Sequence, residues 1–192
     1  MGECPPAEPI SIDPPPGTED ARQPHNPGAG QDQDPALRQG IGSLAEPIVM
    51  VLSASGASAD CFTLCETAAD SELGANGIAS VTEGPPGTYT IVLNHAIAPG
   101  AWTTISYPGG SVAYLSHPAN ANADGFSNAS DVLALIDVLN EVIVPPFGMY
   151  SVDIDHSGAL NASDVLRLID LLNGAIPYDV WNGVAKPDNT CP

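Results

Sequence analysis

Two stretches of this chain repeat each other and decide how it is organised. Residues 120–140 read NANADGFSNASDVLALIDVLN, and residues 153–173 read DIDHSGALNASDVLRLIDLLN, at an offset of 33 residues. Within them, 12 of the 16 residues from 125–140 are identical to those from 158–173. Self-similarity of this kind indicates one supersecondary unit used twice.

Each copy opens with a twelve-residue loop that has the spacing of a calcium site. Oxygen-bearing side chains occupy loop positions 1, 3, 5 and 12, and a glycine at position 6 makes the sharp turn that brings in the carbonyl of position 7. Magnesium favours a tighter octahedron with more water, so we expect two Ca²⁺ ions. The predicted ligands are Asn120, Asn122, Asp124, Phe126 (through its carbonyl) and Asp131 in the first loop, and Asp153, Asp155, Ser157, Ala159 (through its carbonyl) and Asp164 in the second.

The two loops differ in charge. The first offers two carboxylates, because Asn120 and Asn122 stand at positions 1 and 3, and the second offers three. Since the number of charged ligands tunes calcium affinity, we predict that the second loop binds more tightly. The alternative is that each loop is an Asn- and Asp-rich turn that caps a helix and binds nothing.

A short helix is expected directly after each loop. Apolar residues recur at i, i+4 and i+7, which predicts one buried stripe per helix, and Gly174 followed by Pro177 ends the second helix. Prolines before each loop exclude the leading helix of an EF-hand. The stripes are Val132, Ile136 and Leu139, with Leu135 beside them, and Val165, Ile169 and Leu172; the expected N-caps are Ser130 and Ser163.

Composition excludes several classes of function. The chain has 23 acidic and 4 basic residues, a net charge of −19, which argues against nucleic acid and anionic membrane surfaces. No apolar run is longer than that of residues 48–52, which is far too short to span a membrane. The sequence has no G-x-S-x-G and no H-E-x-x-H, and its four histidines are scattered. We therefore expect no catalytic residues and no organic cofactor.

The fold class expected is α+β, in two domains behind a disordered tether. Residues 1–44 hold nine of the twenty prolines and predict a linker. Residues 45–117 predict a small antiparallel β-sandwich that resembles immunoglobulin-like or fibronectin-like modules in strand rhythm, and residues 118–192 predict an all-α calcium module. The expected strands are 48–52, 61–65, 77–81, 88–94, 102–107 and 111–116.

The cysteines point to an oxidising compartment. Four occur, at positions 4, 61, 65 and 191, so three pairings are possible, and we favour a disulfide that involves Cys61 or Cys65. The first residues lack the basic and apolar parts of a signal peptide. Either a secretion signal lies upstream in a longer parent, or the chain stays inside the cell. We favour the first and expect an extracellular or cell-surface location.

The duplicated loop–helix pattern resembles a dockerin domain of type I, and a β module before a divergent dockerin is similar to secreted proteins of planctomycete-type bacteria. The resemblance implies an antiparallel helix pair around two calcium ions that docks onto a cohesin-like β-sandwich protein, usually from an extracellular polysaccharide-degrading enzyme that contacts carbohydrate. It implies two docking orientations. The implied partner-binding residues, at loop positions 10 and 11, are Ala129, Ser130, Ala162 and Ser163.

The sequence departs from that family at two kinds of position. Loop position 8, usually aliphatic, is Ser127 in the first copy, and Asp137 and Asp170 replace basic residues of the recognition helices. The function expected is a non-catalytic, calcium-dependent docking module. Two alternatives are the C-terminal fragment of a secreted polysaccharide hydrolase, and a calcium-stapled structural or surface-attachment domain without a cohesin partner.

Overall fold

The chain divides into two compact units. The computed structural model describes residues 4–22, 39–69, 73–175 and 179–192. The first unit takes 1–18, 24–114 and 189–192, and the second takes 19–23 and 115–188. The second unit therefore combines a short segment near the N-terminus with most of the C-terminal third.

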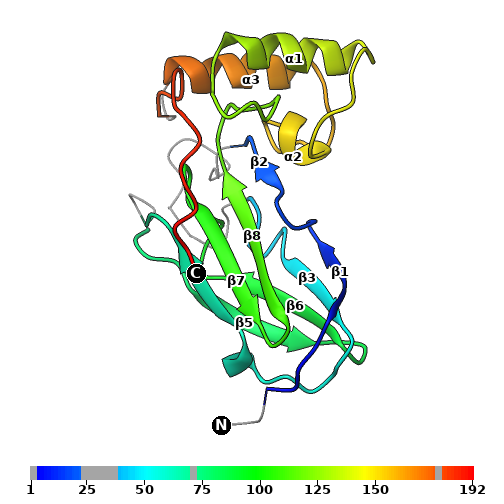
Figure 1. Cartoon of the computed structure of the whole chain (residues 1–192). Coiled ribbons are helices and arrows are strands. Elements are labelled where there is room, and N and C mark those ends of the chain that lie inside the picture. The colour runs from blue at the N-terminus through cyan, green and yellow to red at the C-terminus, as the bar shows by residue number, and fades with distance from the viewer. Residues whose placement is uncertain (1–3, 23–38, 70–72, 176–178) are drawn as a thin grey trace. The chain divides into compact units, whose positions relative to one another are not determined.

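The described residues form eight strands and few helices (Figure 1). Two four-stranded sheets have the orders β1-β3-β6-β5 and β2-β8-β7-β4. The predicted α+β fold class is therefore wrong, because the described residues form mostly β-strands and only three short α-helices. The elements are β1 Pro9–Asp13, β2 Glu19–Asp20, β3 Ile48–Leu52, the 3₁₀ turn η2 Ala59–Cys61, β4 Thr63–Glu66, β5 Ile78–Glu83, β6 Thr88–Leu93, β7 Trp102–Tyr107, β8 Gly110–Ser116, α1 Ala129–Leu139, α2 Met149–Val152 and α3 Ala162–Asn173.

Alternating side chains build the core of the first unit. Strand β3 lies antiparallel between β1 and β6, and its residues at positions 48, 50 and 52 are buried. Tyr89 in β6 is also buried and packs its ring against Phe62. The other sheet pairs β4 antiparallel with β7. Six of the strands follow the expected rhythm, because alternation on a half-buried sheet is a reliable signal.

The expected tether is partly structured, which corrects the prediction for residues 1–44. Strand β1 pairs with β3 through Ile12 and Met50, and Cys4 forms a disulfide with Cys61. A strand with prolines near it is tolerated at the edge of a sheet, where N–H groups are not all needed. Two parts of the expected tether, residues 1–3 and 23–38, lie outside the described residues.

Two disulfides join segments that are distant in sequence. Cys4 bonds Cys61, and Cys65 bonds Cys191, at sequence separations of 57 and 126. The expectation that Cys61 or Cys65 is oxidised is confirmed. Such bonds persist in oxidising compartments, so they are consistent with an extracellular protein. Among the described residues, the helices are all too short or too polar to cross a membrane.

The second unit is not the all-α module expected for residues 118–192. Strand β2 pairs in parallel with the end of β8, at Glu19 with Leu115 and Asp20 with Ser116. Phe126 forms a further antiparallel bridge with Ala185 in the C-terminal tail. The sequence argument missed this because β2 comes from the expected tether and has only two residues, which no periodicity can reveal.

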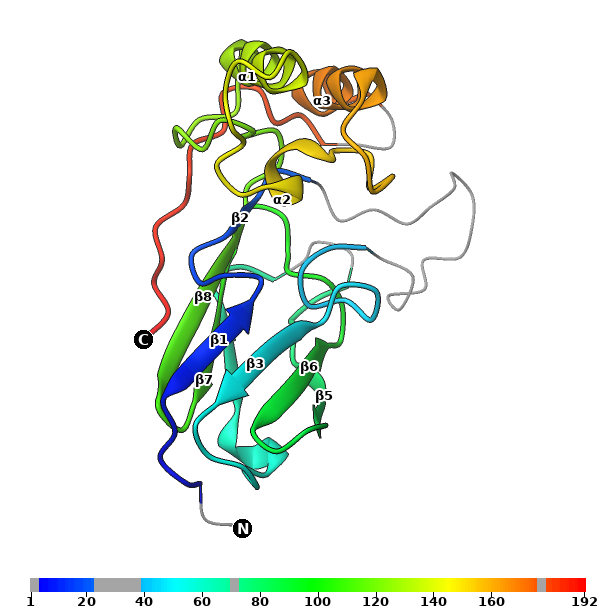
Figure 2. The same cartoon turned by 90° about the vertical axis from the view of Figure 1, so that its right-hand side faces the viewer.

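Helices α1 and α3 lie side by side (Figure 2), and both contribute buried side chains to one core. Leu135 and Leu168 are fully buried in it, whereas Ile136 and Ile169 are 38% and 37% exposed. Three residues of the predicted stripes, Val132, Val165 and Leu172, do pack in or against this core. The prediction is wrong at the isoleucine in the middle of each helix, because an apolar residue stands directly before it and leaves the phase of the stripe undecided. The tail contributes Trp181, and the remaining core residues include Val152, Ile154, Leu171 and Leu172.

Asparagines, not the expected serines, cap both helices. The side chain of Asn128 accepts a hydrogen bond from the backbone N–H of Ser130, and Asn161 does the same for Ser163. Each cap is closed by the aspartate three residues later, which forms a capping box. At the other end, Gly174 takes the left-handed conformation (φ 64°) and ends α3 as predicted.

Neighbouring leucines of α3 give a direct test of this packing. Leu168→Ala should lower the free energy of unfolding of the protein by about 2–5 kcal/mol, because it leaves a cavity in a fully buried site. Leu166→Ala, at a side chain that is 65% exposed, should change it by less than about 0.5 kcal/mol. Urea unfolding measures both, and equal losses would contradict the assigned phase of α3.

Candidate metal centre

The aspartates at position 12 close both loops in the same way. Asp164 is fully buried, and its two carboxylate oxygens accept the backbone N–H groups of Asp155 (3.1 Å) and Asn161 (2.7 Å). Asp131 is also fully buried and accepts those of Asn122 (3.1 Å) and Asn128 (2.8 Å). The two loops therefore repeat each other in geometry as well as in sequence.

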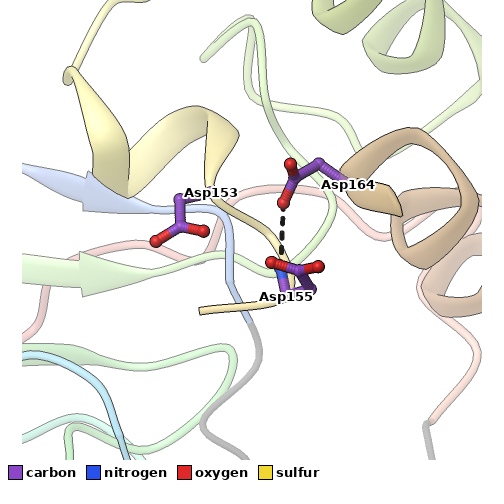
Figure 3. Close-up of side chains that lie close together, drawn as sticks. All are labelled: Asp153, Asp155 and Asp164. Atoms are coloured by element: carbon purple, nitrogen blue, oxygen red, sulfur yellow. Dashed lines mark hydrogen bonds between the residues drawn. The ribbon is translucent and has the colours of Figure 1, made fainter. Parts of the chain in front are cut away.

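In the second loop, three carboxylates converge. Oxygens of Asp153, Asp155 and Asp164 lie within 4.8 Å of one another, with the first two on the segment after α2 and the third in the first turn of α3 (Figure 3). Burial raises the pKa of Asp164, and the negative charges of Asp155 and Asp153 raise it further. Three hard, anionic oxygens around one point form a donor set suited to Ca²⁺.

The other predicted groups of the second loop surround this cluster. The carboxylate of Asp153 accepts the backbone N–H groups of Ser157 (2.9 Å) and Gly158 (3.0 Å), which hold it in place. The hydroxyl of Ser157 donates to the carbonyl of Ala159 at 3.1 Å, and the side-chain amide of Asn161 donates to the same carbonyl at 2.9 Å. All five predicted positions thus belong to one connected loop.

The first loop brings together a less charged set. The side-chain amide of Asn122 donates to the carboxylate of Asp124 at 3.0 Å, and that carboxylate accepts the N–H of Phe126 at 2.9 Å. Burial raises the pKa of Asp131, and the nearby charge of Asp124 adds to it. The carbonyl of Phe126, predicted as the position 7 ligand, accepts the side-chain amide of Asn128 at 3.2 Å.

At position 1 of the first loop, a buried side-chain oxygen has no hydrogen-bond partner in the part of the chain that the structure describes. Asn120 is 2% exposed, and its side-chain nitrogen contacts the carboxylate of Glu19 (3.3 Å) and Nδ1 of His117 (3.1 Å). Its Oδ1 has no hydrogen-bond partner among the described residues. Such an orphaned acceptor is costly unless something binds it, and a calcium ion would. The residues of this loop therefore also fit Ca²⁺.

The imidazole of His117 is set up as an acceptor. Its Nε2 lies 3.3 Å from the carbonyl of Val184, which can only accept, so the proton belongs on Nε2 and Nδ1 is free to accept from Asn120. Burial lowers the pKa of His117, which favours this neutral form. Sequence reasoning missed both His117 and Glu19, and only the closeness of His117 to the loop offered any signal.

The C-terminal tail pairs with the middle of the first loop. Ser127 N–H donates to the carbonyl of Val184 (3.0 Å), Gly183 N–H donates to that of Ser127 (2.7 Å), and Lys186 N–H donates to that of Gly125 (2.9 Å). Ser127 is fully buried, with its hydroxyl on the carbonyl of Pro118 at 2.7 Å. This accounts for serine at position 8, where the second loop has Leu160, because the hydroxyl is satisfied.

The predicted partner-binding pairs fall at the start of each helix. Ala129 and Ala162 are exposed, whereas the hydroxyl of Ser130 accepts from the amide of Asn122 and is only partly accessible. Ser163 is exposed. The two serines thus differ in exposure, although they occupy equivalent loop positions.

Comparison of the chain with protein-family models, curated proteins and solved structures finds no match. The chemistry of the two loops therefore carries the functional argument.

Removing one closing aspartate at a time tests the ranking of the loops. Asp164→Ala should weaken total calcium binding more than Asp131→Ala, because it dismantles the loop with three carboxylates. Asp137→Ala, at an exposed helix position outside both loops, is the matched control and should leave both affinities unchanged. Titration calorimetry measures all three, and equal losses from the two loop variants would refute the ranking.

Proposed function

We propose that this chain is a calcium-dependent protein-docking module of an extracellular protein and has no catalytic role. The observation that carries the proposal is the convergence of Asp153, Asp155 and Asp164 on one point. Carboxylates this close repel one another unless a cation lies between them. The matched geometry of Asp131 in the first loop supports a second ion there.

Exposed apolar side chains at duplicated positions support docking. Leu133 and Leu166 are each 65% exposed, and they are related by the same offset of 33 residues as the loops. Ile136 and Ile169, one turn further along, are also partly exposed. Together with Ala129 and Ala162 they follow i, i+4, i+7 spacing, which places them along one face of each helix. An exposed apolar patch on a folded surface is typical of an interaction site.

Calcium would control this surface by holding the helices that present it. Each loop ends in the capping box of α1 or α3, so an ion in the loop fixes the helix start. Binding energy in such a loop acts as folding energy, because the ligands are not brought together in an unfolded chain. The dockerin resemblance suggests a cohesin-like β-sandwich as partner, and the two disulfides support an extracellular setting.

Charge on the exposed leucines should abolish docking. With the chain immobilised, the double variant Leu133→Glu, Leu166→Glu should retain both calcium ions but lose any partner that EDTA releases from the unaltered chain. Each single variant should still capture the partner, because the unaltered leucine remains exposed on the equivalent face of the other helix. Val144→Glu, at an exposed position outside the helices, is the control.

The opposite results separate docking from a purely structural role. A partner that resists EDTA, or that the double variant still captures, would contradict docking by this face. Calcium binding by both loops with no recovered partner would favour a calcium-stapled structural domain.

A further inference from the structure

The first loop is completed by a residue about a hundred positions upstream. Glu19 is buried, and its carboxylate accepts a hydrogen bond from the side-chain amide of Asn120 at 3.3 Å. Asn120 is the position 1 ligand predicted for this loop. Direct neighbours of metal ligands fix ligand orientation and tune affinity in metal sites generally.

The amide of Asn120 has one orientation that satisfies its surroundings. Its nitrogen contacts two acceptors, the Glu19 carboxylate and Nδ1 of His117. Turning the amide over would set its oxygen against the carboxylate, which is repulsive. The oxygen therefore points away from Glu19, and it is the buried atom that lacks a partner among the described residues.

Glu19 is itself held firmly by the elements around it. It pairs with Leu115 in the parallel β2–β8 ladder, and its other carboxylate oxygen forms an ion pair with Lys186. The next residue, Asp20, is anchored by a buried ion pair with Arg22 at 2.7 Å, and its carbonyl accepts the N–H of His117. The carboxylate of Glu19 thus has a fixed position beside the loop.

We propose that Glu19 is a positioning residue of the first calcium site. It orients Asn120 so that Oδ1 faces the ion, and it places a third carboxylate, paired with Lys186, beside a loop that has only Asp124 and Asp131 of its own. This inference rests on the proposed calcium binding. It assigns to residues 19–22 a role in the site that their place in the sequence does not suggest.

Glu19→Gln tests the role in two backgrounds that each leave one loop intact. With Asp164→Asn, which leaves the first loop, Glu19→Gln should weaken calcium binding at least about tenfold, the usual cost of altering an outer partner of a ligand, because it replaces the charged acceptor of the Asn120 amide with a neutral one. With Asp131→Asn, which leaves the second loop, the same change should have no effect. Calorimetry measures the affinities, and circular dichroism checks that each variant is folded.

Two control variants separate positioning from charge and from structure. Glu141→Gln removes an exposed negative charge of the same unit and should leave the first loop unchanged. Lys186→Met removes the cation paired with Glu19 and should leave that affinity equal or tighter. If Glu19 mattered only through its ion pair, Lys186→Met would weaken binding as much as Glu19→Gln does.

Each result decides the matter. Unchanged affinity of the first loop in Glu19→Gln, or equal loss in both backgrounds, would overturn the positioning role while calcium binding stands. If Glu19→Gln does not fold, weakening by Lys186→Met would overturn it and equal or tighter binding would support it. Absence of calcium binding in both backgrounds and in the unaltered chain would instead overturn the proposed function.

Discussion

Mutual repulsion among carboxylates is the constraint on which the second unit depends. Asp153, Asp155 and Asp164 present oxygens within 4.8 Å of one another, and Asp164 is fully buried. The raised pKa of Asp164 expresses the cost of holding charge there. A divalent cation between the carboxylates would turn this repulsion into attraction. Its positive charge would compensate the negative charges that burial and the neighbouring acids make unfavourable.

The same aspartates connect the loops to the helices and the core. Asp131 and Asp164 each close a loop and complete a capping box, so under the proposed function one side chain would serve both the ion and the helix start. The helices then bury Leu135 and Leu168 together and leave Leu133 and Leu166 exposed. Under the proposed function, an ion in each loop would therefore be linked through the helix pair to the exposed apolar faces, as a calcium-controlled docking surface requires.

The sequence predicted local features well and long-range ones poorly. The position of a helix directly after each loop and the rhythm of the strands follow from residues close together in the chain, and the structure confirms both where it describes them. The N-caps were wrong by two residues because Asn128 and Ser130 are both good caps. The all-α module was wrong because β2 and the pairing of Phe126 with Ala185 depend on contacts across many residues. The place of Glu19 beside the first loop could not be predicted from the sequence for the same reason, because its contact with Asn120 joins residues that are distant in the chain.

The most direct test of the central claim is a calcium titration of the whole chain by calorimetry, with far-UV circular dichroism before and after EDTA. The account predicts two ions per chain, with unequal affinities, and a gain of helix when calcium is added. Absence of calcium binding, with a helix signal that EDTA does not change, would contradict it and would leave the duplicated loops as helix caps alone.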